Sequence, residues 1–340
     1  VKKYLEVLNS GSHLQSNYVK KFEDKLLTIS GRKYAAALGS CTDALYFALL
    51  SCGIKSDDEV LVPNFSFIAS ASSILRIGAK PIFVDINDDY NLSLEDAERK
   101  ISKRTKALLV VNLFGKMVNP DQIKKFKKKH NLTVIEDAAQ SLGASFRGIK
   151  SGSVGDVSCL SFDPTKVISA PGSAGALLTD KKEIINKVKS LRYHGKTNGQ
   201  FLSLGFNSQM SSLTAVHLMI KLKNLKNWQA KRIKLANFYN KNLSNKIILP
   251  KYSDGSIHIY HKYVIRVKHL RDKLFKELLK KKIETKIHYN KPLNKNFVFK
   301  DCKCIDTSSC KKIRCNIKNS NLISKEVLSL PIHPFIEKKQ

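Results

Sequence analysis

The chain has 340 residues, 42% of them hydrophobic and 26% charged, so it is long enough to bury a large core without disulfide or metal staples. This composition excludes a disordered chain, and no uninterrupted apolar run approaches the roughly 18 residues of a membrane span. Lys and Arg outnumber Asp and Glu by 60 to 28, a net charge of +32 that would attract phosphates, nucleic acid or an anionic membrane surface.

The charge alone does not select a partner. Only ten of the sixty basic residues are Arg, whereas recognition of bases and phosphates with fixed geometry favours Arg. The lysines are spread through amphipathic stretches such as 123–130 and 278–286. We therefore predict solvated lysine faces rather than a nucleic-acid interface.

The N-terminal residues, Val1 to Leu5, lack the apolar core and the small-residue cleavage site of a signal peptide. We expect a cytoplasmic protein with no membrane partner. The chain begins with Val and stops after Gln340, which indicates a trimmed or partial sequence.

From Lys33 to about Leu178, short β-branched runs alternate with helical periods. This alternation is typical of an α/β layer with a mainly parallel sheet. The runs predict strands over 59–62, 81–84, 107–111, 133–135 and 159–162, separated by helices such as 66–77 and 120–130.

After about Gly205 the pattern becomes helical, from Ser211 to Leu243, and then changes to a shorter α+β segment. In that segment we predict a strand over 263–267, a helix over 271–281 and a strand over 284–288. The chain is thus predicted to form a large domain over 1–235, with an N-terminal helical segment, and a small C-terminal α+β domain over 236–340.

The seven cysteines fall into two groups. Cys41, Cys52 and Cys159 lie singly, and the odd total without a signal peptide predicts free thiols. Four more crowd into 14 residues, but their spacing, C-x-C-x5-C-x4-C, lacks the paired C-x2-C of common zinc sites. We therefore favour free thiols over zinc, and predict no metal, at Cys302, Cys304, Cys310 and Cys315.

Three segments carry chemistry, and the first runs from Gly39 to Leu45. It follows an apolar stretch and opens a helix that is predicted to end near Gly53. Small hydroxyl residues at a helix N-terminus leave backbone N–H groups free, and the positive end of the helix dipole lies there, which suits a phosphate. An ordinary Ser/Thr-capped helix has the same signature, so this segment alone favours only a cap.

The second segment is the end of the strand over 133–135, where Glu136 and Asp137 precede small residues. Ligands of open α/β sheets bind at the carboxyl ends of strands, so Asp137 is placed to face a cleft. A buried carboxylate needs a cationic partner. Capping of the next helix explains Asp137 equally well at this point.

In the third segment, Lys166 follows the strand over 159–162 and precedes the small residues of 169–176. Such residues let a bulky ligand approach the backbone. A lysine that can form a Schiff base, an acid that can hold a pyridinium N–H and a phosphate cup are together what a protein supplies to pyridoxal phosphate.

With these three parts in order, the sequence resembles the DegT/DnrJ/StrS family of sugar aminotransferases, which are fold-type I pyridoxal phosphate enzymes. The resemblance runs from about Leu14 to Ile336 and implies an aspartate-aminotransferase-like large domain. It rests on GRKYAAALGSCTDAL (31–45), DDEVLVPNFSFIASASSILRIGAKPIFVDI (57–86), VIEDAAQSLGA (134–144), GDVSCLSFDPTK (155–166), LRYHG (191–195), GFNSQMSSLTA (205–215) and IHYNKPL (287–293).

The resemblance assigns a role to each matching residue. Lys166 matches the lysine that bonds covalently to the cofactor and moves the proton, and Asp137 matches the acid that keeps the pyridine nitrogen protonated. The other matches are Cys41, Thr42 and Ser161 at the phosphate, Phe67 stacked on the ring, Gln140 near the ring hydroxyl, Asn207 from the second subunit of a homodimer with shared active sites, and His288 with Tyr289 near the sugar.

Three positions depart from the family pattern. Cys41 stands where Gly is common, which a contact through the backbone N–H tolerates, and Asn112 and Gln209 stand where His and Arg are usual. Lys166 is retained, which argues against the dehydratase branch, where His replaces it.

The resemblance implies an aminotransferase that uses L-glutamate as donor and a keto group of a dTDP- or UDP-linked deoxysugar as acceptor, in surface glycan biosynthesis such as that of lipopolysaccharide. A dehydratase or aromatizing synthase of the same family is one alternative. A basic nucleic-acid-binding regulatory protein is a more distant one.

Overall fold

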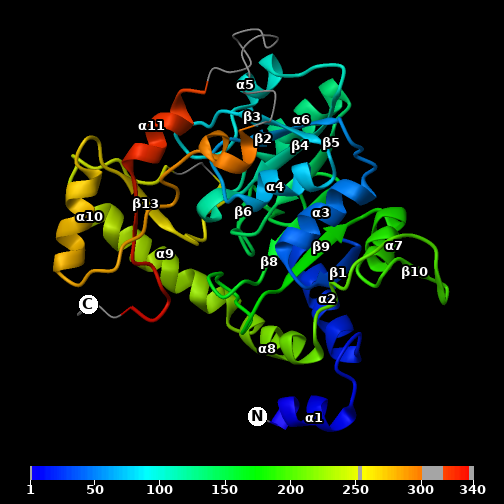
Figure 1. Ribbon diagram of the computed structural model, residues 1–340. Helices are drawn as coiled ribbons and strands as arrows, with labels where there is room; N and C mark the ends of the chain where they lie inside the picture. Colours follow the sequence, from blue (N-terminus) through cyan, green and yellow to red (C-terminus); the bar gives the residue numbers. More distant parts are fainter. Residues whose placement is uncertain (1, 252–254, 301–316, 337–340) are drawn as a thin grey trace.

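A seven-stranded sheet lies at the centre of the computed structural model, which describes residues 2–251, 255–300 and 317–336. Its strand order is β1-β9-β8-β5-β4-β2-β3 (Figure 1). β9 runs antiparallel to both of its neighbours, and the other pairs are parallel, which confirms the predicted mainly parallel sheet. The strands are β1 (Tyr34–Leu38), β2 (Glu59–Pro63), β3 (Lys80–Val84), β4 (Thr105–Val111), β5 (Thr133–Asp137), β8 (Val157–Ser161) and β9 (Gly175–Thr179).

Helices cover both faces of the sheet, so the strands are apolar on both sides. In β4, Leu109 packs into the core beneath α3 and α4, whereas Leu108 packs on the opposite side, with Ile123 of α6. One face carries α3 (Cys41–Ser51), α4 (Ala69–Arg76) and α7 (Lys182–Leu191); the other carries α2 (Asn17–Ser30) and α8 (Ser212–Leu222) at one end and α5 (Leu94–Arg99) and α6 (Pro120–His130) at the other.

The predicted helix over 120–130 coincides with α6, while the one over 66–77 begins three residues late, at Ala69. The helical stretch over 211–243 is two helices, α8 and α9 (Leu225–Asn242). Because α9 runs through residues 235 and 236 without a break, a continuous helix links the two proposed domains, and the division itself stays a prediction.

The C-terminal part pairs β13 (Tyr263–Arg266) with β14 (Val327–Leu330), flanked by α10 (Arg271–Lys280) and α11 (Asn319–Glu326). The predicted strand over 284–288 is wrong, since that segment makes only an isolated bridge from Lys286 to Ser329. β14 is preferred beside β13 because Val327 and Leu328 are fully buried there, whereas Glu284 and Lys286 are exposed.

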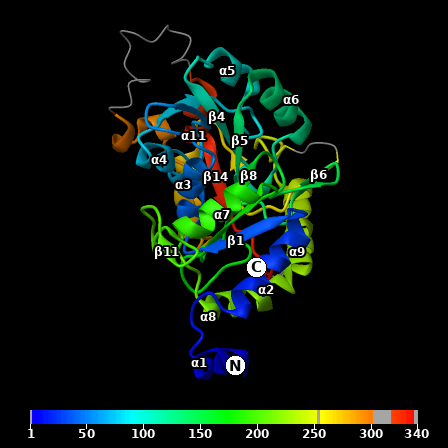
Figure 2. The same cartoon turned by 90° about the vertical axis from the view of Figure 1, so that its right-hand side faces the viewer.

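The remaining elements are short. At the bottom of the molecule α1 (Lys2–Ser10) packs on α8 (Figure 1, Figure 2). The hydroxyl of Tyr4 there lies 2.7 Å from Nδ1 of His217. The others are β6 (Ser145–Phe146), β7 (Ile149–Lys150), β10 (Lys196–Thr197), β11 (Gln200–Phe201), β12 (Ser256–Ile257) and 3-10 turns over Leu113–Gly115, Leu293–Lys295 and Phe297–Phe299.

Within the described ranges, no helix is long and apolar enough to cross a membrane. The same residues contain no cluster of three or more His, Cys, Asp or Glu that could hold a metal ion. Cys302, Cys304, Cys310 and Cys315 lie outside the described residues, and the other three cysteines are free thiols.

Candidate active site

The N-terminus of α3 forms one wall of the site, at the carboxyl end of β1. Ser40 caps the helix, because its side chain accepts the N–H of Asp43 at 3.0 Å. Gly175 of β9 permits the close approach, since a Cβ there would lie 2.4 Å from the backbone nitrogen of Cys41. The first N–H groups of a helix, here those of Cys41 and Thr42, have no partner within the helix and can bind an anion.

Asp137 is the last residue of β5, and its side chain is buried. It accepts hydrogen bonds from Oγ of Ser70, on α4, at 2.8 Å and from the N–H of Ala139 at 3.1 Å. Burial raises the pKa of this carboxyl, and the two donors and the positive charge of Lys166 oppose the rise. The positive charge of Lys166 therefore acts on the Asp137 carboxyl and favours its ionised form.

Glu136, its neighbour, points to the opposite face and takes part in the fold rather than in this site. It is fully buried and accepts from Nδ2 of Asn112 at 2.7 Å and Oγ of Ser158 at 2.6 Å, besides two backbone N–H groups. Asn112 stands where the family usually has His. Its side chain donates to Glu136 and accepts the N–H of Val118.

Lys166 lies in the connection between β8 and β9 and is half-buried. The connection is closed at its base, where the N–H of Phe162 donates to the carbonyl of Ala174 at 2.8 Å. The charge of Lys166 acts on Asp137 and on Cys41, whose pKa is raised mainly by burial, so its thiol stays protonated. Ser161, at the end of β8, is buried and accepts from the N–H of Asp163 at 3.4 Å.

Aromatic side chains line the site beside Asp137. Phe67 is 53% exposed, with its ring centroid 6.5 Å from that of Tyr289, so one ring is free to cover a ligand. Gln140 accepts the N–H of Phe114 at 2.9 Å and donates to the hydroxyl of Tyr289 at 3.4 Å. Burial raises the pKa of Tyr289 well above neutrality, so this hydroxyl keeps its proton.

His288 lies beside Tyr289, and its Nδ1 is 2.8 Å from Oγ of Ser329. Burial, aided by the charges of Lys262, Lys286 and Lys166, lowers the pKa of His288 to about 4. The imidazole is therefore neutral at pH 7.

Asn207 is exposed, and its Oδ1 accepts from Nε2 of Gln209 at 3.4 Å. Its neighbour Ser208 accepts the N–H of Gly39 of the same chain through its carbonyl at 3.1 Å, so the segment passes the start of α3. The predicted residues Lys166, Asp137, Cys41, Gln140 and Tyr289 are thus joined by contact or charge. Among the contacts of the described residues, none places the Asn207 side chain with them.

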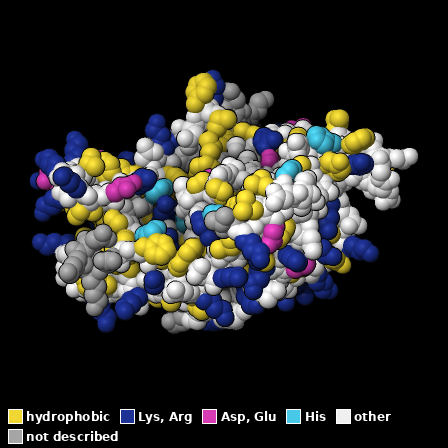
Figure 3. All heavy atoms as spheres, turned by 90° about the horizontal axis from the view of Figure 1, so that it is seen from below, with side chains coloured by type: hydrophobic (Ala, Val, Ile, Leu, Met, Phe, Trp, Pro, Cys, Tyr) yellow, Lys and Arg dark blue, Asp and Glu magenta, His cyan; other side chains and the backbone are white. Residues whose placement is uncertain are grey.

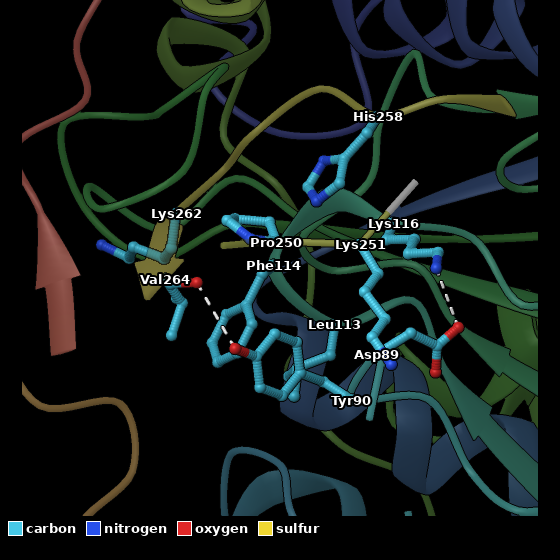
Figure 4. Close-up of a pocket in the computed structure, with 10 residues that line it drawn as sticks. All are labelled: Asp89, Tyr90, Leu113, Phe114, Lys116, Pro250, Lys251, His258, Lys262 and Val264. Carbon is cyan, nitrogen blue, oxygen red and sulfur yellow. Dashed lines mark hydrogen bonds and ion pairs between the residues drawn. The ribbon is translucent and has the colours of Figure 1, made fainter. Parts of the chain in front are cut away.

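Three residues at the site were not predicted from the sequence. Ser70 is one serine of a Ser-rich helix, and Phe114 is one aromatic residue of a turn, so neither carries a distinguishing signal. Lys262 does, because it is the one lysine within 257–265, a segment whose other residues are aliphatic, aromatic or His. It lines a cavity of about 10 Å³ together with Tyr90 and Phe114 (Figure 4).

This donor set fits pyridoxal phosphate. A primary amine, a buried carboxylate within reach of the charge of that amine, an open helix N-terminus and an exposed aromatic ring match the cofactor's aldehyde, pyridine nitrogen, phosphate and ring face. Burial raises the pKa of Asp137, and a pyridinium N–H bound to its carboxylate would oppose that rise by favouring the ionised form.

The comparisons with known proteins agree with this fit. The chain is 35% identical over 338 residues to dTDP-3-amino-3,6-dideoxy-alpha-D-galactopyranose transaminase of Aneurinibacillus thermoaerophilus, covering 98% of this chain and 90% of that protein. It is 32% identical over 334 residues to UDP-2-acetamido-2-deoxy-3-oxo-D-glucuronate aminotransferase of Pseudomonas aeruginosa, covering 97% and 90%.

The crystal structure of NtdA from Bacillus subtilis with bound cofactor PMP is similar at a TM-score of 0.88 and 30% identity, covering 98% of this chain and 76% of that one. The model of the DegT/DnrJ/EryC1/StrS aminotransferase family matches residues 1–340. The resemblance, the fold type and the cofactor are thereby confirmed, and the chain belongs to the DegT/DnrJ/EryC1/StrS family as a pyridoxal phosphate-dependent aminotransferase.

Proposed function

We propose that the chain transfers the amino group of L-glutamate to a keto group of a dTDP- or UDP-linked deoxysugar, in the biosynthesis of a surface glycan. The observation that carries this proposal is the electrostatic coupling of Lys166 and Asp137 beside the open N-terminus of α3. The relatives that act on dTDP- and UDP-linked sugars support the choice of acceptor.

In this proposal the amine of Lys166 would hold the cofactor through its aldehyde and would move the proton of the reacting carbon, since its flexible four-carbon stem can bring the amine to either position. Asp137 would accept the pyridinium N–H in its ionised form, with Ser70 and Ala139 orienting the carboxylate. The bound cofactor supplies an electron sink for the negative charge that develops when the proton leaves.

The remaining predicted residues bind and orient. The N–H groups of Cys41 and Thr42 and the hydroxyl of Ser161 would hold the phosphate, Phe67 would cover the ring, and Gln140 would contact its hydroxyl. His288 and Tyr289 face the sugar. Because the imidazole is neutral and the phenol keeps its proton at pH 7, they serve as hydrogen-bonding groups rather than as charged ones.

We also propose a homodimer in which Asn207 completes the partner's site. The segment before Asn207 supports this, because it exposes Phe201 by 67%, Leu202 by 66% and Leu204 by 94%. Three large apolar side chains within four residues are costly on a free surface. Elsewhere the surface is rich in Lys and Arg, many of which lie toward the edge of the face in Figure 3.

One experiment tests the activity. The purified protein is expected to show the absorbance band of lysine-bound cofactor, to lose it with borohydride, and to yield a labelled peptide containing Lys166. A Lys166→Ala variant should lack the band, while Lys189→Ala, an exposed lysine of α7, should keep it.

Mass spectrometry of products then identifies the reaction after incubation with glutamate and a panel of dTDP-, UDP- and GDP-linked ketosugars. We expect an aminosugar together with 2-oxoglutarate, formed only when Lys166 is present. A sugar that loses oxygen without gaining nitrogen would instead show a dehydratase, and absence of the band would reject the proposal.

A further inference from the structure

Lys262 lies directly before β13 and is half-buried. Its N–H donates to the carbonyl of Phe114 at 3.3 Å, and the N–H of Phe114 in turn donates to Gln140. These two hydrogen bonds connect the backbone of Lys262, through Phe114, to the side chain of Gln140 in the candidate active site. The side chain extends away from the ion pair of Lys116 and Asp89 on the other side of the cavity (Figure 4).

The cations around this cavity differ in whether a carboxylate balances them. Lys116 lies 2.9 Å from Asp89, and Lys251 lies 3.0 Å from Asp88. Across residues 2–251, 255–300 and 317–336, no carboxylate lies within ion-pair distance of Lys262. Among the described lysines that line the cavity, Lys262 is therefore the one without a carboxylate partner.

The groups that face Lys262 are themselves mostly positive. Burial lowers its pKa to about 8, with contributions from the charges of Lys166, Lys286 and Arg232, whereas the charge of Asp163 opposes them. His261 and His288 also lie within the reach of its charge, but burial lowers the pKa of both, so they are neutral. A half-buried ammonium among cations is costly unless an anion joins it.

We propose that Lys262 binds the α-carboxylate of the amino-acid donor next to Lys166, an inference that rests on the proposed function. The α-carboxylate is attached to the carbon that bears the transferred amine, so its receptor must lie close to the lysine that serves that carbon. A single compact anion suits a half-buried ammonium, whereas the diphosphate of a nucleotide sugar is bulkier and lies further from the reacting carbon.

The test measures the two half-reactions separately in Lys262→Gln, in Lys262→Arg, which keeps the charge, and in Lys280→Gln. Lys280 is an exposed control on α10 that pairs with Glu277 at 2.9 Å. Loss of a charged hydrogen bond should lower kcat/KM for glutamate by about 10- to 100-fold in Lys262→Gln. Lys262→Arg should recover much of that loss, and the control should match the wild type. The ketosugar half-reaction should be unchanged within about threefold.

A pH profile gives a readout that a merely structural role would not move. The wild-type kcat/KM for glutamate should fall above about pH 8, as Lys262 loses its proton, and this limb should be absent in Lys262→Gln. Calorimetry with 2-methyl-L-glutamate, which lacks the α-proton and cannot complete transamination, should show the same loss of affinity.

Equal binding of 2-methyl-L-glutamate by the wild type and Lys262→Gln would overturn the inference and leave the proposed function standing. So would a loss confined to the ketosugar half-reaction, which would assign Lys262 to the other substrate. If the wild type neither binds 2-methyl-L-glutamate nor releases 2-oxoglutarate, the proposed donor is wrong and the inference falls with it.

Discussion

Glu136 and Asp137 are adjacent in β5, and the alternation of a strand sends their side chains to opposite faces of the sheet. Glu136 accepts four hydrogen bonds from the chain itself, so its acceptor capacity is largely used. Asp137 accepts two, which leaves lone pairs for a ligand. Substitutions at these two neighbours should therefore have different effects.

Removing the donor behind Asp137 tests its role in cofactor binding. Ser70→Ala deletes a hydrogen bond that lowers the pKa of Asp137, so this pKa should rise further above its ordinary value. Because the pyridinium needs an ionised partner, cofactor affinity at pH 7 should fall about tenfold, and its acid limb should move to higher pH. Titration of the apoenzyme with pyridoxal phosphate between about pH 5 and pH 8 measures both.

The matched control for that substitution is Ser73→Ala, in the same helix. Ser73 is equally buried, but its hydroxyl only donates to the carbonyl of Ser70 at 3.4 Å. Its cofactor affinity should follow the wild type across the pH range. An equal shift in the two variants would mean that α4 packing, not the Asp137 contact, sets the affinity.

Substitution of Glu136 should affect stability instead. Glu136→Gln places an amide N–H₂ among donors that need an acceptor, which should lower the free energy of unfolding by about 2–4 kcal/mol. The folded fraction should bind the cofactor normally. Urea unfolding checks the first expectation, with Glu183→Gln on the surface of α7 as a control expected to change by less than about 0.5 kcal/mol. Loss of cofactor affinity without loss of stability would show that Glu136 belongs to the site.

At the scale of elements, the close packing of the α3 N-terminus against β9 depends on Gly175. Gly175→Ala would place a Cβ 2.4 Å from backbone atoms of Ser40 and Cys41, which cannot rotate away, so the helix N-terminus must shift. We expect a loss of about 1–3 kcal/mol in stability and at least a tenfold loss in affinity for the cofactor phosphate. Thermal unfolding and pyridoxal phosphate titration measure the two effects.

Gly172→Ala is the control in the same connection, since a Cβ there would have no heavy atom within 4 Å. Its stability and cofactor affinity should stay near the wild-type values. If Gly175→Ala also binds the cofactor normally, the start of α3 does not hold the phosphate.

The elements show where sequence reasoning succeeds. Strands buried on both faces are short continuous apolar runs, so β2 to β5 were predictable, and α6 was predictable from its period and its Asn cap. β14 was missed because its four residues follow a helix directly and only their burial against β13 distinguishes them. Lys166 and Asp137 were found through their flanking segments, but Ser70 was not, because its contact with Asp137 spans 67 positions of the chain.

At the scale of the whole molecule, a single chain gives little information about its assembly. The spacing of residues predicts what one chain folds into, whereas a subunit interface is a property of two surfaces. Phe201, Leu202 and Leu204 are apolar in the sequence, but so are many buried residues, and only the fold shows that these three face outward. The shared site at Asn207 therefore needs a test that depends on two chains.

Subunit exchange provides that test. Lys166→Ala and Asn207→Ala should each be weakly active or inactive alone. If Asn207 completes the partner's site, a hybrid dimer contains one site with neither substitution, so random mixing of equal amounts should restore about a quarter of the wild-type activity. Activity should rise with the time allowed for exchange, as followed by native mass spectrometry. Hybrids that form without recovering activity would place Asn207 in the site of its own chain, which its neighbour Ser208 already approaches at Gly39.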